Sequence, residues 1–140
     1  MTRSLAALLA LLLLLAAAAP ARAESGDPAF LQHFFAPELV LKNAAAISLS
    51  SAQRSALLKD IGRVSGSTTE LQLSMLDGFS AVEELSAADP VDEKALLEAI
   101  HGVLSAELRV KEAHMGLLVR VRNLLTPEQR EKLRALRDGH

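Results

Sequence analysis

The 140-residue sequence contains no cysteine, tryptophan or tyrosine, and only four phenylalanines. The absence of cysteine excludes disulfide bonds, thiolate metal ligands and lipid attachment to an N-terminal cysteine. The sequence also lacks a Gly-x-Ser-x-Gly motif, a glycine-rich phosphate loop and a His-Glu-x-x-His motif. Because hydrolases, nucleotide-binding proteins and zinc proteases carry their chemistry on such motifs, the sequence predicts a protein that is not an enzyme.

The first 23 residues are typical of a secretory signal peptide. Arg3 precedes an apolar run from Leu5 to Ala19, and the small residues of Ala21-Arg22-Ala23 follow Pro20. The run of about 15 residues is shorter than the roughly 20 that a membrane-spanning helix needs. We therefore expect export, removal of residues 1–23 by cleavage near Ala23/Glu24, and one domain at 24–140 with no membrane span.

The charge of this mature chain argues against nucleic acid as a partner. Loss of Arg3 and Arg22 removes two of the 15 basic residues, while the 17 acidic ones remain, so the net charge becomes −4. A nucleic-acid-binding domain needs a basic surface.

Helix-start signals organise the mature chain. Four prolines follow Asp, Ala or Thr in the manner of a first helical residue, at Pro28, Pro37, Pro90 and Pro127. Two capping boxes also mark helix starts: Ser50 to Gln53 marks a further start, and Thr126 to Gln129 coincides with the start at Pro127. No stretch alternates with a period of two, so we expect an all-α protein. The expected elements are a short helix or pair of helices over 28–46, helices over 50–87 and 90–125, and a short helix over 127–137.

The two long helices predict a helical hairpin. On the first, apolar residues recur at alternating intervals of four and three, which is typical of a seam between packed helices. This seam runs through Gly66, so we expect a kink there rather than a break. The second long helix carries three adjacent apolar lines. The first runs through Leu96, Val103, Val110, Leu117 and Leu124, the second through Leu97, Leu104, Lys111, Leu118 and Leu125, and the third through Ile100, Glu107, His114 and Val121. Joined by a short connection near Asp89, the two helices must pack antiparallel, with short flanking helices before and after them. The seam of the first helix consists of Leu57, Ile61, Val64, Thr68, Leu71, Met75, Gly78, Val82 and Leu85.

One level of the second long helix is polar. Glu107, Lys111 and His114 interrupt its apolar lines, and folding the hairpin about Asp89 brings Thr68 opposite this level. Glu107 and Lys111 have the favourable i, i+4 spacing for an ion pair. Three interpretations stay open: a solvent-facing stripe, a buried polar layer that sets the register of the helices, and a ligand or metal site.

Histidine and carboxylate side chains are the available metal ligands. His33 and His114 with Glu107 form the candidate set, and they suit zinc, copper or nickel. Neither histidine has a second histidine four residues away. A site would therefore have to bring His33, or a second subunit, to His114. Further candidate ligands are His101, His140 and Met115.

Phenylalanines cluster near the mature N-terminus, at Phe30, Phe34 and Phe35, and are followed by Leu39 and Val40. Two interpretations stay open here as well. The cluster can close one end of the hairpin, or it can form an exposed apolar surface that binds an unfolded or partner protein.

Two pentapeptides about 76 residues apart resemble the paired Leu-Thr-x-x-Gln motifs of the Spy/CpxP superfamily of periplasmic proteins, which includes heavy-metal-resistance and heavy-metal-sensor members. A serine replaces threonine in the first, and both hydroxyls can cap a helix. The segment from Phe35 to Leu41 is also similar to that group. The residues that carry the motif resemblance are Leu49, Ser50, Gln53, Leu125, Thr126 and Gln129.

The resemblance implies a hooked helical hairpin that forms a cradle-shaped antiparallel homodimer and works in the periplasm without ATP. Members of the superfamily bind unfolded clients, restrain a sensor kinase, or bind zinc, copper, nickel or cobalt through His, Glu and Met. We therefore expect an envelope-stress or metal-stress accessory protein that binds unfolded proteins, or a membrane sensor or anti-sigma partner, and requires no cofactor. The alternatives are a heavy-metal sensor or resistance protein that uses His33, Glu107 and His114, and a purely structural dimer.

Overall fold

The computed structural model describes residues 28–139, so the expected signal peptide and His140 lie outside the described residues. Contacts along the chain divide it into Met1–Leu31 and Gln32–His140, and the description that follows concerns the second unit. The protein is all-helical, as expected. Its elements are a 3-10 helix η1 (Ala29–His33) and the α-helices α2 (Pro37–Lys42), α3 (Ser51–Ser86), α4 (Glu93–Leu124) and α5 (Pro127–Asp138).

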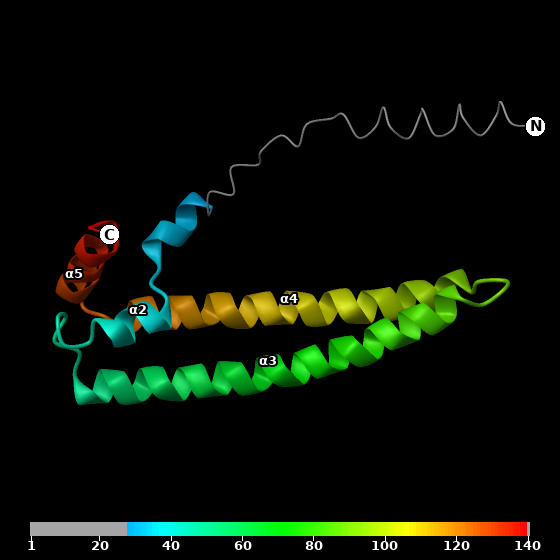
Figure 1. Cartoon of the computed structure of the whole chain (residues 1–140), viewed down its shortest axis with the longest axis horizontal. Coiled ribbons are helices and arrows are strands. Elements are labelled where there is room, and N and C mark those ends of the chain that lie inside the picture. Colours follow the sequence, from blue (N-terminus) through cyan, green and yellow to red (C-terminus); the bar gives the residue numbers. More distant parts are fainter. Residues whose placement is uncertain (1–27, 140) are drawn as a thin grey trace, which may run out of the picture. The chain divides into compact units, whose positions relative to one another are not determined.

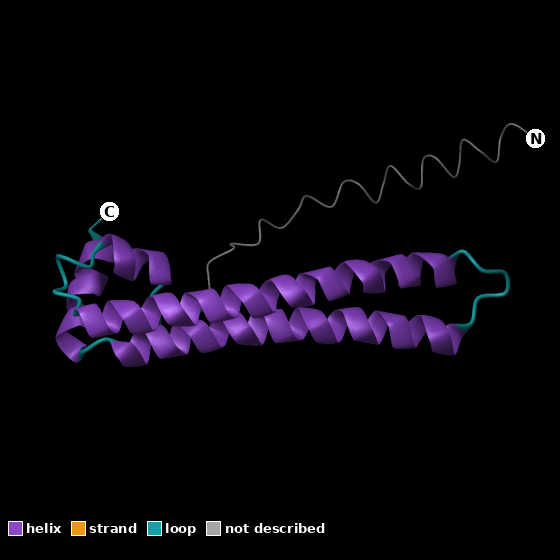
Figure 2. Ribbon diagram, turned by 90° about the horizontal axis from the view of Figure 1, so that it is seen from below, coloured by secondary structure: helices purple, strands orange, loops and turns teal. Residues whose placement is uncertain are grey.

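Helices α3 and α4 form the predicted antiparallel hairpin and lie side by side in both ribbon views (Figures 1 and 2). We call the end with the connection 87–92 the tip, and the opposite end, where α2 and α5 lie, the base. No helix between residues 28 and 139 has both the length and the apolar character needed to cross a membrane.

Helix α3 is continuous through Gly66, as its seam predicted. The Ser67 hydroxyl donates to the Val64 carbonyl at 3.1 Å. Thr69 donates in the same way to the Ser65 carbonyl at 2.9 Å. Both hydroxyls therefore bind the helix to which they belong.

The predicted start of α4 is wrong by three residues. The helix begins at Glu93 rather than Pro90, because the Asp92 carboxylate accepts the Ala95 N–H at 3.0 Å and so provides the N-cap. Asp89 and Pro90 lie in the connection. The predicted pair of short helices over 28–46 is confirmed as η1 and α2, but α2 ends at Lys42 and the chain turns between Asn43 and Ser48.

The core lies at the base of the hairpin. There α2 and α5 cover the α3–α4 seam, and the largest fully buried side chains gather. A hairpin of two helices has little interior of its own, so burial depends on this third layer. The buried cluster consists of Phe35, Val40, Ile47, Leu57, Val64, Leu117, Val121, Leu125 and Leu133.

Only part of the predicted apolar surface of α4 is buried. Val103 and Leu117, from the first predicted line, lie in the seam with Ala106. The tip end of the second line, at Leu97 and Leu104, is exposed instead, whereas Leu118 is half-buried and Leu125 is buried. Near the tip α3 is the only helix that covers α4 within the described residues, so one line suffices to form the seam.

Gly78 allows α3 and α4 to approach closely. A Cβ atom at this position would lie 2.7 Å from Val103 Cγ2. This contact also fixes the register of the hairpin. Because Gly78 lies against Val103, Thr68 lies level with residue 113, whereas folding the hairpin about Asp89 would place it level with residue 110.

We expect Gly78→Ala to lower the free energy of unfolding by about 1 kcal/mol, because the clash with the branched Val103 side chain exceeds the gain in helix propensity. Gly62→Ala is the matched control, since nothing lies within 4 Å of its added Cβ. The control should raise stability by about 0.5–1 kcal/mol. Urea unfolding followed by circular dichroism measures both, and equal stabilisation by the two variants would contradict the close approach.

Candidate functional site

Both predicted capping boxes are formed at the base. In the first, the Ser50 hydroxyl accepts the Gln53 N–H at 3.1 Å, and Gln53 Oε1 accepts the Ser50 N–H at 3.0 Å. In the second, Thr126 and Gln129 make the same two bonds at 3.2 and 3.0 Å. Each box satisfies two backbone donors that a helix start leaves without partners. Hydrogen bonds to its own backbone N–H and to the Thr126 hydroxyl also lower the pKa of Glu128 in the first turn of α5.

The two glutamines of these boxes also bind each other. Gln53 Nε2 donates to Gln129 Oε1 at 2.8 Å, and Gln129 Nε2 donates to Gln53 Oε1 at 3.0 Å. Gln53 Nε2 donates further to the Leu124 carbonyl at 2.8 Å. Gln129 Nε2 lies 3.4 Å from the carbonyls of Ile47 and Ser48. The pair thus joins the turn before α3, the start of α3, the end of α4 and the start of α5.

The turn that faces Gln129 has an unusual backbone. Ser48 has a φ of 54°, a left-handed conformation that residues other than glycine rarely adopt. The bonds to Gln129 help to hold it there. Leu125 is buried beside this junction and Leu49 is half-buried, so all six residues of the two pentapeptides gather at one place.

The assignment of Phe35 and Val40 to a partner-binding surface is wrong. Both are fully buried in the core, because α2 packs between the hairpin and α5. Leu39 is half-buried against the same cluster. Phe34 is half-buried, with the Arg122 guanidinium 5.9 Å from its ring. Phe30 is exposed.

The polar level of α4 does not form one layer with Thr68. Glu107 and Lys111 make an exposed ion pair with a 2.9 Å separation of Oε1 and Nζ, and such a pair adds little stability. Thr68 is buried, while His114 is exposed. The register set by Gly78 places Thr68 beside His114 instead. Thr68 and His114 therefore share a pocket in which Glu107 and Lys111 take no part.

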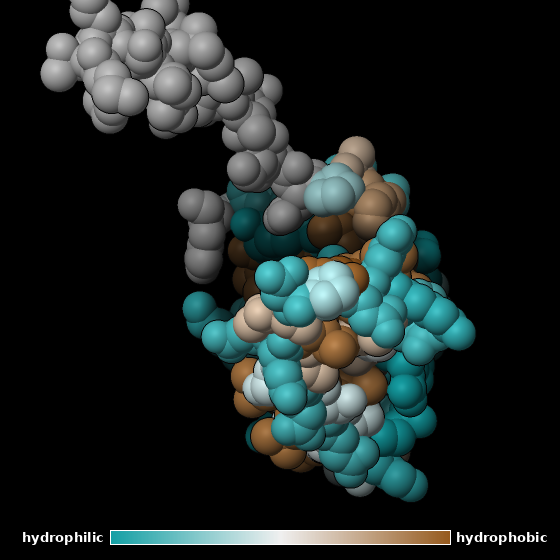
Figure 3. Space-filling view, turned by 90° about the vertical axis from the view of Figure 1, so that its right-hand side faces the viewer, coloured by the Kyte–Doolittle hydropathy of each residue, from teal (hydrophilic) through white to brown (hydrophobic). Residues whose placement is uncertain are grey.

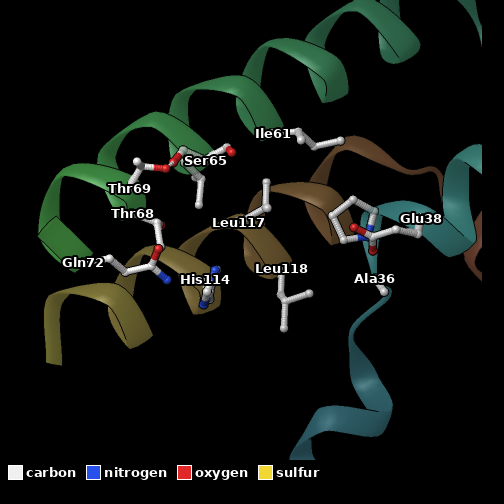
Figure 4. A pocket seen from close by; sticks show the side chains of 12 residues that line it. Ala36, Glu38, Ile61, Ser65, Thr68, Thr69, Gln72, His114, Leu117 and Leu118 are labelled. Carbon is white, nitrogen blue, oxygen red and sulfur yellow. Dashed lines mark hydrogen bonds between the residues drawn. The ribbon is translucent and has the colours of Figure 1, made fainter. Parts of the chain in front are cut away.

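This pocket has a volume of about 530 Å³ and lies between α3, α4 and the start of α2. Figure 4 shows its two ends. Thr68, Gln72 and His114 lie together at one end, and the hydrocarbon side chains of Ile61, Leu117 and Leu118 lie toward the other. Glu38, from α2, lies beyond the hydrocarbon end. The pocket is thus polar at one end and apolar at the other.

The proposed metal ligands do not come together in one subunit. His33 lies in a shallow cavity with Arg134, Arg137 and Asp138, Glu107 pairs with Lys111, and His114 lies in the pocket. Residues 28–139 contain no group of three His, Asp or Glu side chains that could hold a metal ion. Within this part of one subunit, the side chains do not fit a metal centre.

Sequence reasoning missed an exposed apolar surface near the tip. Leu76 and Phe79 on α3, with Leu97 and Leu104 on α4, are each more than half exposed, and we call these four residues the distal patch. Figure 3 looks at the hairpin from its tip and shows hydrophobic residues at the surface among hydrophilic ones. The sequence contains one indication of this surface, the apolar line through Leu97 and Leu104. The apolar pattern alone predicts that this line lies in the interior of the protein.

The distal patch lies on the same face as the pocket. Residues three and four apart share one side of a helix. The pocket residues Thr69 and Gln72 therefore lie on the same side of α3 as Leu76 and Phe79. On α4, steps of three, four or seven residues lead from the pocket residue His114 through Lys111 and Glu107 to Leu104 and Leu97. These residues therefore lie on one side of α4. We call this side of the hairpin the pocket face. On the other side, Asp60 pairs with Arg63 and, at 3.3 Å, with Arg120 of α4.

The fold, together with the hydrogen-bonded pair Gln53 and Gln129, defines a hooked helical hairpin closed by paired capping boxes. The sequence model of one family, described as heavy-metal resistance, matches residues 3–132. The chain therefore belongs to the heavy-metal resistance family, which is part of the Spy/CpxP-like helical superfamily. Comparison with curated proteins and with solved structures finds no significant match to either.

We expect Gln53→Ala and Gln129→Ala each to lower the free energy of unfolding by about 1–3 kcal/mol, because each leaves buried or part-buried partners without hydrogen bonds. The double variant should lose less than the sum, with a coupling of about 0.5–3 kcal/mol. Chemical unfolding of the four proteins measures this. Gln72→Ala, at an exposed glutamine, is the control and should change stability little. Strict additivity would contradict the pairing.

Proposed function

We propose that the protein is an exported accessory protein of the metal-stress or envelope-stress response that binds other polypeptides reversibly, without ATP and without catalysis. The observation that carries the proposal is the distal patch, whose four large apolar side chains are exposed. Exposed apolar surfaces of this kind mark sites of interaction. The heavy-metal resistance family supports the physiological setting, and the two pentapeptides support the Spy/CpxP type with its periplasmic location.

Apolar burial is non-directional, so such a surface accepts many sequences rather than one. The charge around the distal patch narrows the range of polypeptides that it can bind. Residues 70–110, which make up the tip half of the hairpin, include nine acidic and two basic side chains, a net charge of −7. The remaining described residues include 11 basic and six acidic ones, a net charge of +5. The distal patch therefore favours basic clients or partner segments and disfavours nucleic acid.

The same separation of charge supports an antiparallel homodimer. In that arrangement the acidic tip half of one subunit lies near the basic base half of the other, whereas a parallel pair places like charges together. A dimer also covers apolar surface that one hairpin leaves exposed. Sedimentation velocity at micromolar concentration tests this part of the proposal, and a stable monomer would refute it.

We expect the protein to suppress light scattering by aggregating unfolded clients at several-fold molar excess. Replacing two apolar side chains of the distal patch, in Leu76→Ser/Phe79→Ser, should weaken client binding at least about 10-fold, since each loses an apolar burial energy of order 1 kcal/mol or more.

Val119→Ser is the control, because it removes an exposed apolar side chain from the outer side of the base half. It should retain suppression. Absence of suppression by the wild-type protein across a range of clients would refute client binding. Equal activity of the distal-patch variant and the control would place the binding surface elsewhere.

A second candidate function, binding of a heavy metal as a sensor or resistance protein, is favoured by the family's description. Because the described part of one subunit assembles no three-ligand group, such a site would need ligands from a second subunit or from residues outside 28–139, such as His140. Calorimetric titration with zinc, nickel, cobalt and copper tests it. Under our leading proposal the wild-type protein and His114→Ala give the same heats. A saturable heat that depends on His114 would favour the metal sensor.

A further inference from the structure

The pocket contains a polar group that the fold leaves without a partner. Thr68 is 7% exposed, and its hydroxyl oxygen makes no hydrogen bond with any described residue. A helical threonine ordinarily donates to the carbonyl four residues earlier. For Thr68 that carbonyl belongs to Val64, and it already accepts the Ser67 hydroxyl. A buried hydroxyl without a partner is destabilising. Because this oxygen has almost no exposed surface, a ligand in the pocket gains the hydrogen bond when the Thr68 side chain turns toward it.

The neighbours of Thr68 define the chemistry of that ligand. Gln72 and His114 lie at the same end of the pocket, and a hydroxyl, a carboxamide and an imidazole can each donate or accept a hydrogen bond. Ile61 and Leu118 lie toward the other end and suit a rigid apolar body. Glu38, the only carboxylate among the residues that line the pocket, disfavours an anionic ligand. The combination fits a neutral hydroxyl on a flat hydrocarbon ring.

We propose that this pocket binds a phenol ring, namely the side chain of a tyrosine in a bound polypeptide, with the phenol hydroxyl hydrogen-bonded to Thr68. The proposal deepens the polypeptide-binding function proposed above and rests on it. The sequence contains no tyrosine, so neither this chain nor a second copy can supply the ring. Because the pocket lies on the same face as the distal patch, one extended segment can occupy both.

The test compares two small probes that represent the side chains of tyrosine and phenylalanine. p-Cresol and toluene are titrated separately into the 15N-labelled protein, and amide shifts around Thr68 and His114 report binding. We expect p-cresol to bind about 3- to 10-fold more tightly than toluene, which corresponds to one net hydrogen bond.

Two matched variants locate the hydrogen bond. Thr68→Val keeps the shape of the side chain but removes the hydroxyl. We expect the Thr68→Val protein to lose the preference for p-cresol and still to bind toluene. Ser86→Ala is the control, because Ser86 lies outside the pocket, its exposed hydroxyl already bonds to the Val82 carbonyl, and its removal should not affect the preference. Thermal unfolding confirms that both variants fold.

The outcomes separate this proposal from the proposed function. Equal affinities for the two probes, or a preference that survives in Thr68→Val, would overturn the phenol site while leaving light-scattering results untouched. An unstructured peptide with one tyrosine, compared with its phenylalanine counterpart, then identifies the source of the ring. The same preference in the peptides supports a polypeptide ligand. Binding of p-cresol without any preference between the peptides would instead identify a free phenol as the ligand and overturn the tyrosine assignment.

Discussion

The rest of the structure depends on the reciprocal hydrogen bonds between the carboxamides of Gln53 and Gln129. Each glutamine caps the start of its own helix and also binds the other, so two local signals become one long-range contact. An isolated capping box fixes only where a helix begins. Here the shared carboxamides also fix how α5 turns back over the base, and α5 brings Leu133 into the core. The hook and the core are therefore consequences of the same pair of side chains.

This arrangement separates stability from binding along the molecule. Near the base, α2 and α5 add a third layer, and side chains such as Phe35 and Leu133 are fully buried. Near the tip the hairpin has only two helices, and the leucines and phenylalanine of the distal patch remain in solvent. A region with few buried contacts opens locally at lower cost than the core. Under the proposed function, the half that offers an apolar surface is thus also the half that can adjust to different partners.

The sequence predicts helix starts that depend on neighbouring residues. It does not predict burial or register, which depend on contacts between elements far apart in the chain. The starts of α3 and α5 are confirmed because a hydroxyl and a glutamine three residues later suffice to define a capping box. The start of α4 was wrong because the Asp92 carboxylate competes with the proline signal. Burial of Val40 depends on a core that α3, α4 and α5 also supply, and the register of Thr68 depends on the Gly78 contact with Val103. None of these long-range contacts has a signature in the local pattern, so the pocket was not predicted.

The chain belongs to a heavy-metal resistance family, yet its histidines His33 and His114 lie in separate cavities. A metal-dependent switch needs ligands that are brought together by the element it controls. Here His33 lies beside the basic C-terminal helix, while His114 lies in a pocket with an unpartnered threonine and no second histidine. Under the proposal above, that pocket recognises a neutral hydrogen-bonding group. The proposal thus assigns part of a bound polypeptide, rather than a metal ion, to the position that sequence reasoning gave to a metal ligand.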